Sequence, residues 1–416
     1  MSEHVKLSEV CEILNSNVDK KIKENEQKVK LCNFTDVYNN WAITKYTSKK
    51  FMKATATQNE INKFSLKKGY VAITKDSETK DDIGISTYIA DNFDNVLLGY
   101  HCTLLKPNQK VLNGKFLNAY LNSFYGRKYF SNCASGSGQR YTLTIDTIKD
   151  LNIPLINIET QQKIARTLSV LDQKIENNHK INELLHKILE LLYEQYFVRF
   201  DFSDENNKPY QTSGGKMKFS KELNRLIPND FEVKTLGELI TYISGSQPPK
   251  SCHIYEHKEG YIRFIQNRDY NSNDYITYIP ISKNNKICYQ YDIMIDKYGE
   301  AGAVRFGLQG AYNVALSKIS VLNQSMQEYI RSYLNSKPIK KYLSNACMAS
   351  TRSSLNENHI CSLMLPIPPI NLLQKYEKIA KNIITAIINN NQSTQTLTAL
   401  MDFLLPLLLK QQVKPK

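Results

Sequence analysis

Two long stretches of the chain repeat apolar residues at alternating spacings of three and four positions, over 157–200 and 371–416. This spacing is a heptad pattern and predicts two long amphipathic helices. About 40 helical residues make a rod of about 60 Å, so one small domain cannot cover such a helix along its length. We therefore expect the two helices to pair through Ile164, Leu168, Leu171, Ile175, Leu185, Leu189 and Leu192 of the first and Ile379, Ile383, Leu397, Leu400 and Leu404 of the second.

Polar residues interrupt both heptad patterns in mid-helix. Asn178, Asn182 and Asn390 occupy positions that are otherwise apolar. Such residues can fix the register and orientation of paired helices at some cost in stability. Pro406 is expected to bend or end the second helix near its last turns. The alternative is that each amphipathic helix lies only on its own domain.

The chain also contains an internal duplication. The string Tyr-Leu-Asn-Ser at 120–123 recurs at 333–336, Ile-Pro-Leu at 153–155 is echoed by Leu-Pro-Ile at 365–367, and Lys-Ile-Ala at 163–165 recurs at 378–380. The offset stays between 212 and 215, so the chain is two copies of one unit. This predicts a first globular domain (1–156), a first helix (157–200), an exposed connector (201–227), a second globular domain (228–370) and a second helix (371–416).

The two globular blocks share one style of sequence. Short runs rich in β-branched and aromatic residues, such as 70–74 and 261–265, alternate with turn residues and shorter helical segments such as 115–123. Such runs are typical of strands. The predicted fold class is therefore α+β, with each globular domain followed by a long helix and the two helices pairing as a coiled coil.

The overall charge favours an acidic partner. Lys and Arg number 54 against 40 Asp and Glu, a formal charge of +14, and 41% of residues are hydrophobic, as in a folded chain. This balance suits contact with nucleic-acid phosphates. The chain has no run of about 18 apolar residues, so we expect a soluble, cytoplasmic protein. Eight scattered cysteines without paired short spacings predict reduced thiols and no metal site.

Loops in both globular blocks combine basic and amide side chains with Tyr and Gly. Arg can pair bidentately with guanine, and Asn or Gln with adenine, in the major groove. A solvated loop is the alternative for any single residue. The candidate DNA-binding residues are Lys75, Ser137, Gln139, Arg140 and Tyr141 in the first block and Arg263, Gln266, Asn267, Arg268, Lys297 and Tyr298 in the second.

Motifs of the common catalytic classes are absent from the sequence. It has no GxxxxGK[ST] phosphate loop, no Asn/Asp-Pro-Pro-aromatic loop and no convincing nuclease carboxylate set. We expect a non-catalytic recognition protein with two reading domains held apart by paired helices. Two alternatives stay open: a self-contained restriction enzyme or DNA methyltransferase with its own recognition repeats, and a coiled-coil scaffold that binds only proteins.

The sequence resembles the specificity subunit of type I restriction-modification systems along essentially its whole length. The residues that carry the resemblance run from Ser135-Gly136-Ser137-Gly138-Gln139 to Glu159-Thr160-Gln161-Gln162-Lys163-Ile164-Ala165, and a weaker copy follows at 367–380. The resemblance implies two target recognition domains that read a split double-stranded DNA site, each followed by one helix of an antiparallel coiled coil. It also implies two methyltransferase subunits that use S-adenosylmethionine, and restriction subunits that use ATP and magnesium, with no cofactor on this chain. In this scheme Arg140 and Arg352 contact DNA.

Overall fold

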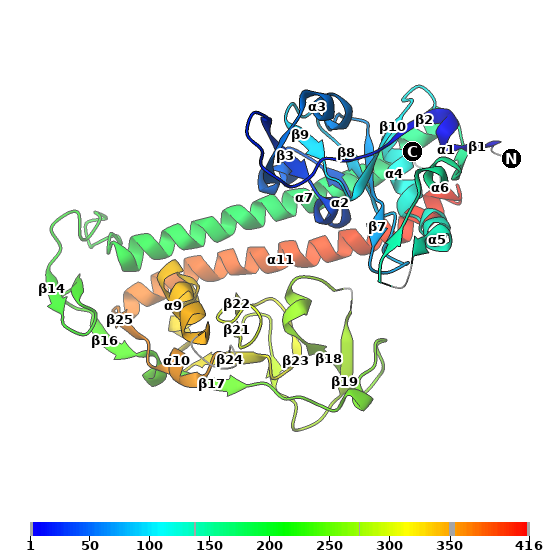
Figure 1. Cartoon of the computed structure of the whole chain (residues 1–416). Coiled ribbons are helices and arrows are strands. Elements are labelled where there is room, and N and C mark those ends of the chain that lie inside the picture. Colours follow the sequence, from blue (N-terminus) through cyan, green and yellow to red (C-terminus); the bar gives the residue numbers. More distant parts are fainter. Residues whose placement is uncertain (1–2, 137–138, 274, 349–353, 414–416) are drawn as a thin grey trace. The chain divides into compact units, whose positions relative to one another are not determined.

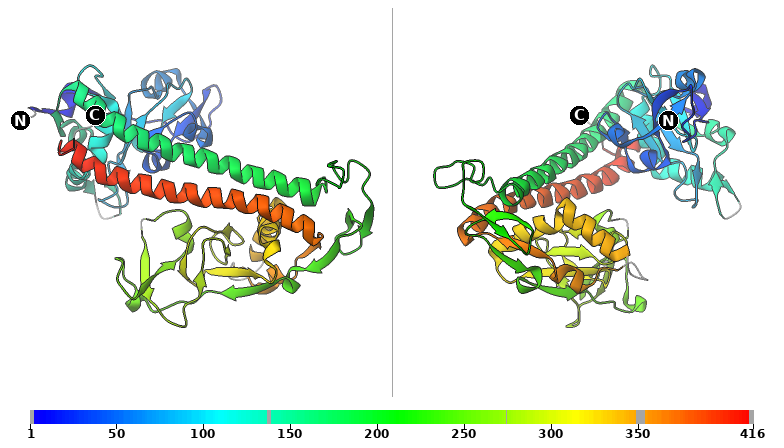
Figure 2. Two further views of the ribbon diagram at one scale, coloured as in Figure 1. Left: turned by 180° about the vertical axis from the view of Figure 1, so that it is seen from behind. Right: turned by 60° about the vertical axis from the view of Figure 1, so that its left-hand side comes forward.

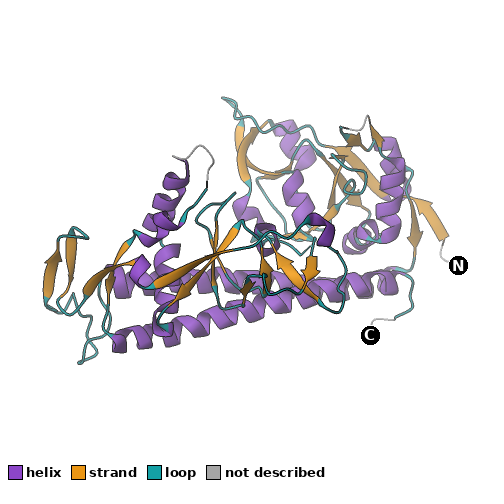
Figure 3. Cartoon of the chain, turned by 90° about the horizontal axis from the view of Figure 1, so that it is seen from below, coloured by secondary structure: helices purple, strands orange, loops and turns teal. Residues whose placement is uncertain are grey.

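The computed structural model describes residues 3–136, 139–273, 275–348 and 354–413. The chain forms two compact units, which we describe one at a time. Unit 1 comprises Met1–Asn178 with Ser393–Lys416, and unit 2 comprises His179–Gln392. Both units combine small sheets with helices, as Figure 3 shows, and the predicted α+β class is therefore confirmed. Within the described ranges, no helix is long and apolar enough to cross a membrane.

Unit 1 is built on a five-stranded sheet of order β2-β10-β6-β8-β4, beside a three-stranded sheet of order β5-β3-β9 (Figure 1). Two smaller ladders, β1-β13 and β11-β12-β7, complete its strands. The strands are β1 (Glu3–Lys6), β2 (Cys11–Asn15), β3 (Gln27–Cys32), β4 (Ala42–Ile43), β5 (Met52–Ala56), β6 (Val71–Thr74), β7 (Asp76–Ser77), β8 (Ser86–Ile89), β9 (Val96–Leu98), β10 (Cys102–Pro107), β11 (Ser135–Gly136), β12 (Tyr141–Thr142) and β13 (Asn152–Leu155).

Short helices pack on these sheets and close the main core of unit 1. The side chain of Asn113 caps α4 by accepting hydrogen bonds from the backbone N–H groups of Lys115 and Phe116, which satisfies two otherwise unpaired donors. Phe116 and Leu117 then point into the core. The helices are α1 (Leu7–Val10), α2 (Phe34–Asn39), α3 (Gln58–Phe64), α4 (Gly114–Asn122), α5 (Phe124–Cys133) and α6 (Ile145–Lys149), with a 3-10 turn at Thr47–Lys50.

Unit 2 holds two four-stranded sheets, of order β17-β24-β21-β22 and β19-β18-β23-β20. Two ladders, β14-β15 and β16-β25, lie outside them. The strands are β14 (Met217–Ser220), β15 (Arg225–Pro228), β16 (Glu232–Thr235), β17 (Ile240–Ser244), β18 (Tyr261–Ile265), β19 (Thr277–Pro280), β20 (Ile287–Cys288), β21 (Ile293–Asp296), β22 (Val304–Arg305), β23 (Gly310–Tyr312), β24 (Leu316–Val321) and β25 (Met364–Ile367). The helices are α8 (Gln327–Asn335), α9 (Lys337–Met348) and α10 (Glu357–Cys361).

The two units repeat one topology, which confirms the duplication inferred from sequence. In both, one sheet has four strands in the same order, with β2-β10-β6-β8 of unit 1 matching β17-β24-β21-β22 of unit 2. In both, a strand pair of the second sheet is parallel, β3 with β9 and β18 with β23. The helix pair α4–α5 of unit 1 likewise corresponds to α8–α9 of unit 2.

The two long helices are α7 (Ile158–Tyr193) and α11 (Ile370–Leu409), and α7 is extended by a π-helical turn at Glu194–Val198. In unit 1, Ile164 and Leu168 of α7 share a core with Met401 and Leu405 of α11. Segments of α7 and α11 run side by side in both views of Figure 2. The predicted antiparallel coiled coil is confirmed. The second helix continues one turn past Pro406 before it ends.

Polar contacts join the helices at the predicted asparagines. In unit 2, the side-chain amide of Asn182 donates to Asn391 Oδ1 at 2.8 Å, and Asn390 Nδ2 donates to Asn182 Oδ1 at 2.9 Å. In unit 1, Asn178 Nδ2 donates to Thr394 Oγ1 at 3.2 Å. Asn182 is buried, so these bonds replace water for its amide group. They hold the two helices at one axial register.

The predicted packing of two residues on α11 is wrong. Ile379 and Leu400 are 41% and 40% exposed. The residue that follows each of them, Ala380 or Met401, is buried instead, and so is Ile384, one turn after Ala380. The helix packs against its globular unit as well as against α7. In unit 2, for example, Ala380 belongs to the main core. This second contact widens the buried face beyond the seam that serves helix pairing alone, and Leu397 and Leu404 of that seam stay partly buried.

The segment 201–227, expected to be an exposed connector, is partly structured. It contains β14 and, with the start of β15, forms an antiparallel hairpin. The rings of Phe202 and Tyr210 stack with centroids 4.9 Å apart, and Phe202 also stacks on Phe231 at 6.0 Å. Such few and irregularly spaced aromatic residues give no periodic signal in the sequence. They nevertheless bury the start of this segment against unit 2.

We expect Asn182→Ala to lower the free energy of unfolding by about 1–2 kcal/mol, because the amides of Asn390 and Asn391 each lose a partner. Leu184→Ala is the matched control, since Leu184 lies on the same helix but is 66% exposed. It should change stability by less than about 0.5 kcal/mol. Chemical denaturation followed by circular dichroism measures both. Equal unfolding free energies for Asn182→Ala and wild type would contradict the role of this contact.

A carboxylate on α7 makes stability depend on pH. Burial, reinforced by repulsion from Glu176 one turn away, raises the pKa of Asp172 to about 7, although the Lys115 ammonium opposes the shift. Because this pKa is higher in the folded than in the unfolded chain, the contribution of Asp172 to the free energy of unfolding falls as the pH rises from about 4 to about 7.

Asp172→Asn should therefore stabilise the protein above pH 7 by about 2 kcal/mol and lose most of this advantage near pH 4, where wild-type Asp172 is protonated in the folded chain and about half protonated in the unfolded chain. Denaturant unfolding at pH 4, 6 and 8 measures the difference. The pH 4 measurement is the internal control. Parallel stability curves for the two proteins across this range would refute the expectation.

Candidate nucleic-acid interface

Unit 1 brings three of the predicted DNA-binding residues into one surface cluster. Lys75 lies between β6 and β7, while Arg140 and Tyr141 lie at the start of β12, which pairs with β7. The carbonyl of Lys75 accepts a hydrogen bond from the N–H of Leu143 at 2.8 Å, which ties the two segments together. The side chain of Arg140 is 57% exposed. A basic group is therefore presented to solvent on a backbone held by strand pairing.

Two residues that sequence reasoning did not single out surround Arg140. Its Nη2 lies 2.9 Å from Nδ1 of His101 and 3.6 Å from Oδ2 of Asp76. Nδ1 of His101 is itself 2.9 Å from that carboxylate oxygen. Oδ1 of Asp76 accepts from Thr142 Oγ1 at 3.1 Å. The three side chains come from segments up to 64 residues apart, so no local motif indicates this cluster.

Aromatic rings lie beside the cations of the same cluster. The ammonium of Lys75 sits 4.7 Å from the ring centroid of Tyr100, which is 51% exposed. Lys80 Nζ lies 5.4 Å from the ring of Tyr141. Cations over aromatic faces are weakly stabilising, and exposed rings next to basic groups are typical of nucleic-acid surfaces. Gln139 is exposed next to Arg140, whereas Ser137 lies outside the described residues.

Unit 2 groups three other predicted residues. Asn267 Nδ2 donates to the carbonyl of Tyr298 at 3.0 Å, and Lys297 Nζ lies 3.5 Å from Ser244 Oγ. Tyr298 is 44% exposed. Beneath them, Asp296 is buried and accepts two hydrogen bonds from Arg305, at 3.3 and 3.0 Å. Burial raises the pKa of Asp296, although Arg305 opposes this shift.

The remaining candidates in unit 2 differ in how accessible their side chains are. Arg263 is half-buried and donates through Nη2 to Asn273 Oδ1 at 2.8 Å. The backbone N–H of Gln266 donates to Asp269, and burial raises the pKa of this carboxyl. Arg268 is exposed, 5.7 Å from the ring of Tyr275. Arg263 is thus poorly placed to reach DNA, while Arg268 is accessible. The prediction for Arg352 falls outside the described residues.

Lys75 and Lys297 occupy equivalent positions in the two repeats. Each follows a matching strand, β6 or β21. The N–H of Lys75 donates to the carbonyl of His101, and that of Lys297 donates to the carbonyl of Ala315. The carbonyl of Lys297 accepts from Leu355, just as that of Lys75 accepts from Leu143. The duplication thus places one lysine at the same backbone site of each unit.

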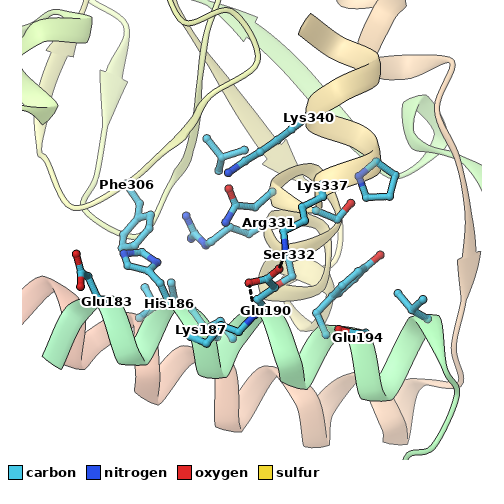
Figure 4. A pocket seen from close by; sticks show the side chains of 18 residues that line it. Glu183, His186, Lys187, Glu190, Glu194, Phe306, Arg331, Ser332, Lys337 and Lys340 are labelled. Atoms are coloured by element: carbon cyan, nitrogen blue, oxygen red, sulfur yellow. Dashed lines mark hydrogen bonds and ion pairs between the residues drawn. The ribbon is translucent and has the colours of Figure 1, made fainter. Parts of the chain in front are cut away.

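A separate hollow of about 770 Å³ lies in unit 2 between α7 and the α8–α9 pair (Figure 4). Its charges are largely paired. Glu190 bridges Lys187 at 2.9 Å and Lys337 at 2.6 Å, as the dashed lines in Figure 4 show. Burial, helped by Lys340, lowers the pKa of His186. The hydroxyl of Ser332 accepts a hydrogen bond from the hydroxyl of Tyr376 at 2.8 Å.

The described residues also contain no group of three or more His, Cys, Asp or Glu side chains that could hold a metal ion. Cys252, His253 and His257 lie close together in the sequence but do not form such a group. The ring of His253 packs on Phe264 at 5.2 Å and that of His257 on Tyr278 at 5.4 Å. These histidines serve as packing groups in unit 2.

The chain combines a duplicated α+β fold with paired long helices, and each repeat carries one cluster of basic and aromatic groups. The family model for the type I restriction modification DNA specificity domain matches residues 2–187 and 228–399. The chain therefore belongs to the family of type I restriction-modification specificity subunits.

Known relatives agree with this assignment. The chain is 28% identical over 346 residues to the type I restriction enzyme MjaIX specificity subunit of Methanocaldococcus jannaschii, covering 81% of this chain and 73% of the relative. It is 23% identical over 413 residues to the HindI specificity subunit of Haemophilus influenzae, covering 84% and 88%. The crystal structure of the type I S subunit from M. genitalium has the same fold, with a TM-score of 0.57 at 16% identity over 98% of this chain and 96% of that one.

Proposed function

We propose that this chain recognises a DNA target in two parts separated by a fixed gap and directs methyltransferase and restriction subunits to it. Each unit would read one half of the target. Membership of the specificity-subunit family supports DNA recognition in general. The observation that carries the two-part target is the equivalence of Lys75 and Lys297, which gives each repeat its own basic site on the same backbone scaffold.

The long helices support the fixed gap. A continuous helix rises 1.5 Å per residue and resists bending, and a paired helix resists it further. The Asn182 contacts add a specific register to this pair. We propose that helix length, set by the sequence, determines the number of unread base pairs between the two halves. A tether without structure would leave that number variable.

The catalytic steps would belong to partner subunits. In this proposal two methyltransferase subunits bind S-adenosylmethionine, the restriction subunits use ATP and magnesium, and this chain holds no cofactor and performs no chemistry. The paired charges of the unit 2 hollow are consistent with a structural role for that region.

A genome-wide map of N6-methyladenine in strains with and without this gene tests the proposal. We expect one two-part motif with a constant gap to lose methylation on deletion and to regain it when the gene is restored. The restored strain is the control for polar effects on neighbouring genes. If every methylated motif survives deletion in a strain that expresses the system, this chain does not supply the specificity.

Purified full-length chain distinguishes the remaining alternatives. Methylation or cleavage of DNA by the chain alone would favour a self-contained enzyme. Protein association without DNA preference, at an affinity that salt does not change, would favour a scaffold, because phosphate contacts weaken steeply as salt rises.

An exposed apolar stripe on α7 supports a docking surface for the methyltransferase subunits. Ile181, Leu184, Ile188 and Leu191 follow each other at spacings of three, four and three residues, and each is between 45% and 66% exposed. Residues spaced in this way lie on one face of a helix. An amphipathic helix of a partner is the occupant that such a stripe fits. We propose that a methyltransferase subunit supplies this helix.

Leu184→Glu should weaken association with the methyltransferase subunit by at least about tenfold, because a charge in an apolar helix contact must be desolvated. Its thermal unfolding and its DNA binding should match wild type. Leu226→Glu, which places the same charge at a 53% exposed leucine of the β14–β15 hairpin, is the control. Sedimentation velocity of the mixed subunits measures association. Equal complex formation by Leu184→Glu and wild type would rule out this stripe.

A further inference from the structure

We propose that Asp76 and His101 act as positioning residues that hold Arg140 in its DNA-binding conformation. The inference rests on the proposed function, since it assumes that Arg140 contacts DNA. The carboxylate of Asp76 is 11% exposed and lies directly beneath the exposed guanidinium. It is fixed in turn by Thr142, which pairs with Asp76 across the β7–β12 ladder and also donates a side-chain hydrogen bond to it.

His101 helps to hold the Arg140 guanidinium in place in either of its neutral tautomers. With a proton on Nδ1, His101 donates to Asp76 at 2.9 Å and leaves the carboxylate charge to hold Arg140 at 3.6 Å. Without that proton, Nδ1 accepts from Arg140 at 2.9 Å. In both states the guanidinium has an anchor on its inner side and an open outer side. An arginine ordered before binding loses less rotamer freedom when it meets DNA.

A comparison of the repeats separates this role from folding. In unit 2 the residue after Lys297 is Tyr298 rather than an aspartate, and the residue equivalent to His101 is Ala315. The backbone hydrogen bonds at the two lysines are nevertheless the same. The common scaffold therefore forms without the carboxylate and the imidazole. Asp76 and His101 therefore have a role in the first repeat that the shared fold does not require.

Electrostatics alone predicts the opposite effect, which makes the inference testable. A carboxylate close to DNA repels phosphate, so its removal should strengthen binding if Asp76 acts only through its charge. If Asp76 positions Arg140, its removal should weaken binding despite the gain in net positive charge. The matched control is Glu78→Gln, which removes an exposed carboxylate two residues away with no described contact to Arg140.

The experiment uses the full chain and a pool of DNA duplexes with 30 randomised base pairs, selected by binding and then sequenced. We expect wild type to select a two-part motif. Arg140→Ala should weaken binding to the selected duplex about tenfold and lose preference in one half only, and Asp76→Asn should cost about fivefold in the same half. Lys297→Ala should affect the other half, and Glu78→Gln should bind as well as wild type or better.

The double variant shows whether Asp76 acts through Arg140. Asp76→Asn combined with Arg140→Ala should bind no more weakly than Arg140→Ala alone. Additive losses would overturn the inference, and so would Asp76→Asn binding as tightly as Glu78→Gln. If Asp76→Asn melts at lower temperature than wild type, His101→Ala replaces it, with an expected loss of about threefold in the same half. A wild-type chain that selects no motif would instead overturn the proposed function itself.

Discussion

The fold depends on each unit receiving a helix segment from the other repeat. In unit 1, Met401, Leu405 and Leu408 of the last helix are buried against residues of the first repeat. In unit 2, Phe197, at the end of the first repeat, lies 4.4 Å from the ring of Tyr329. Burying each such side chain contributes about 1.5–3 kcal/mol. Neither repeat completes its core from its own residues, so the antiparallel course of α7 and α11 is required for both cores.

The two repeats share the backbone hydrogen bonds around the equivalent lysines but differ in the side chains next to them. The same backbone hydrogen bonds surround Lys75 and Lys297, whereas the neighbouring side chains differ, with Asp76 and His101 in one repeat and Tyr298 and Ala315 in the other. Backbone hydrogen bonds form with almost any side chain at a position, so the side chains here can change without loss of the fold.

The same division explains which features were predictable. Periodic or repeated sequence can be recognised without knowledge of contacts. It predicted the duplication, the two helices, their pairing and the asparagines that fix the register. The lysines and Arg140 were candidates from residue type alone. Asp76 and His101 were missed because an acidic residue is not expected at a DNA surface, and because their contacts to Arg140 span 64 and 39 residues. Ile379 and Leu400 were misplaced because the heptad pattern does not show a second packing partner.

The sequence by itself determined the order of elements, the α+β class, the family and the presence of basic loops in both repeats, because these depend on local propensity and periodicity. Tertiary structure alone decided which loops meet, which face of α11 is buried and which groups surround Arg140. Those outcomes depend on contacts between residues far apart in the chain. Strand pairing and helix packing must be in place before the contacts exist, and no local pattern encodes them.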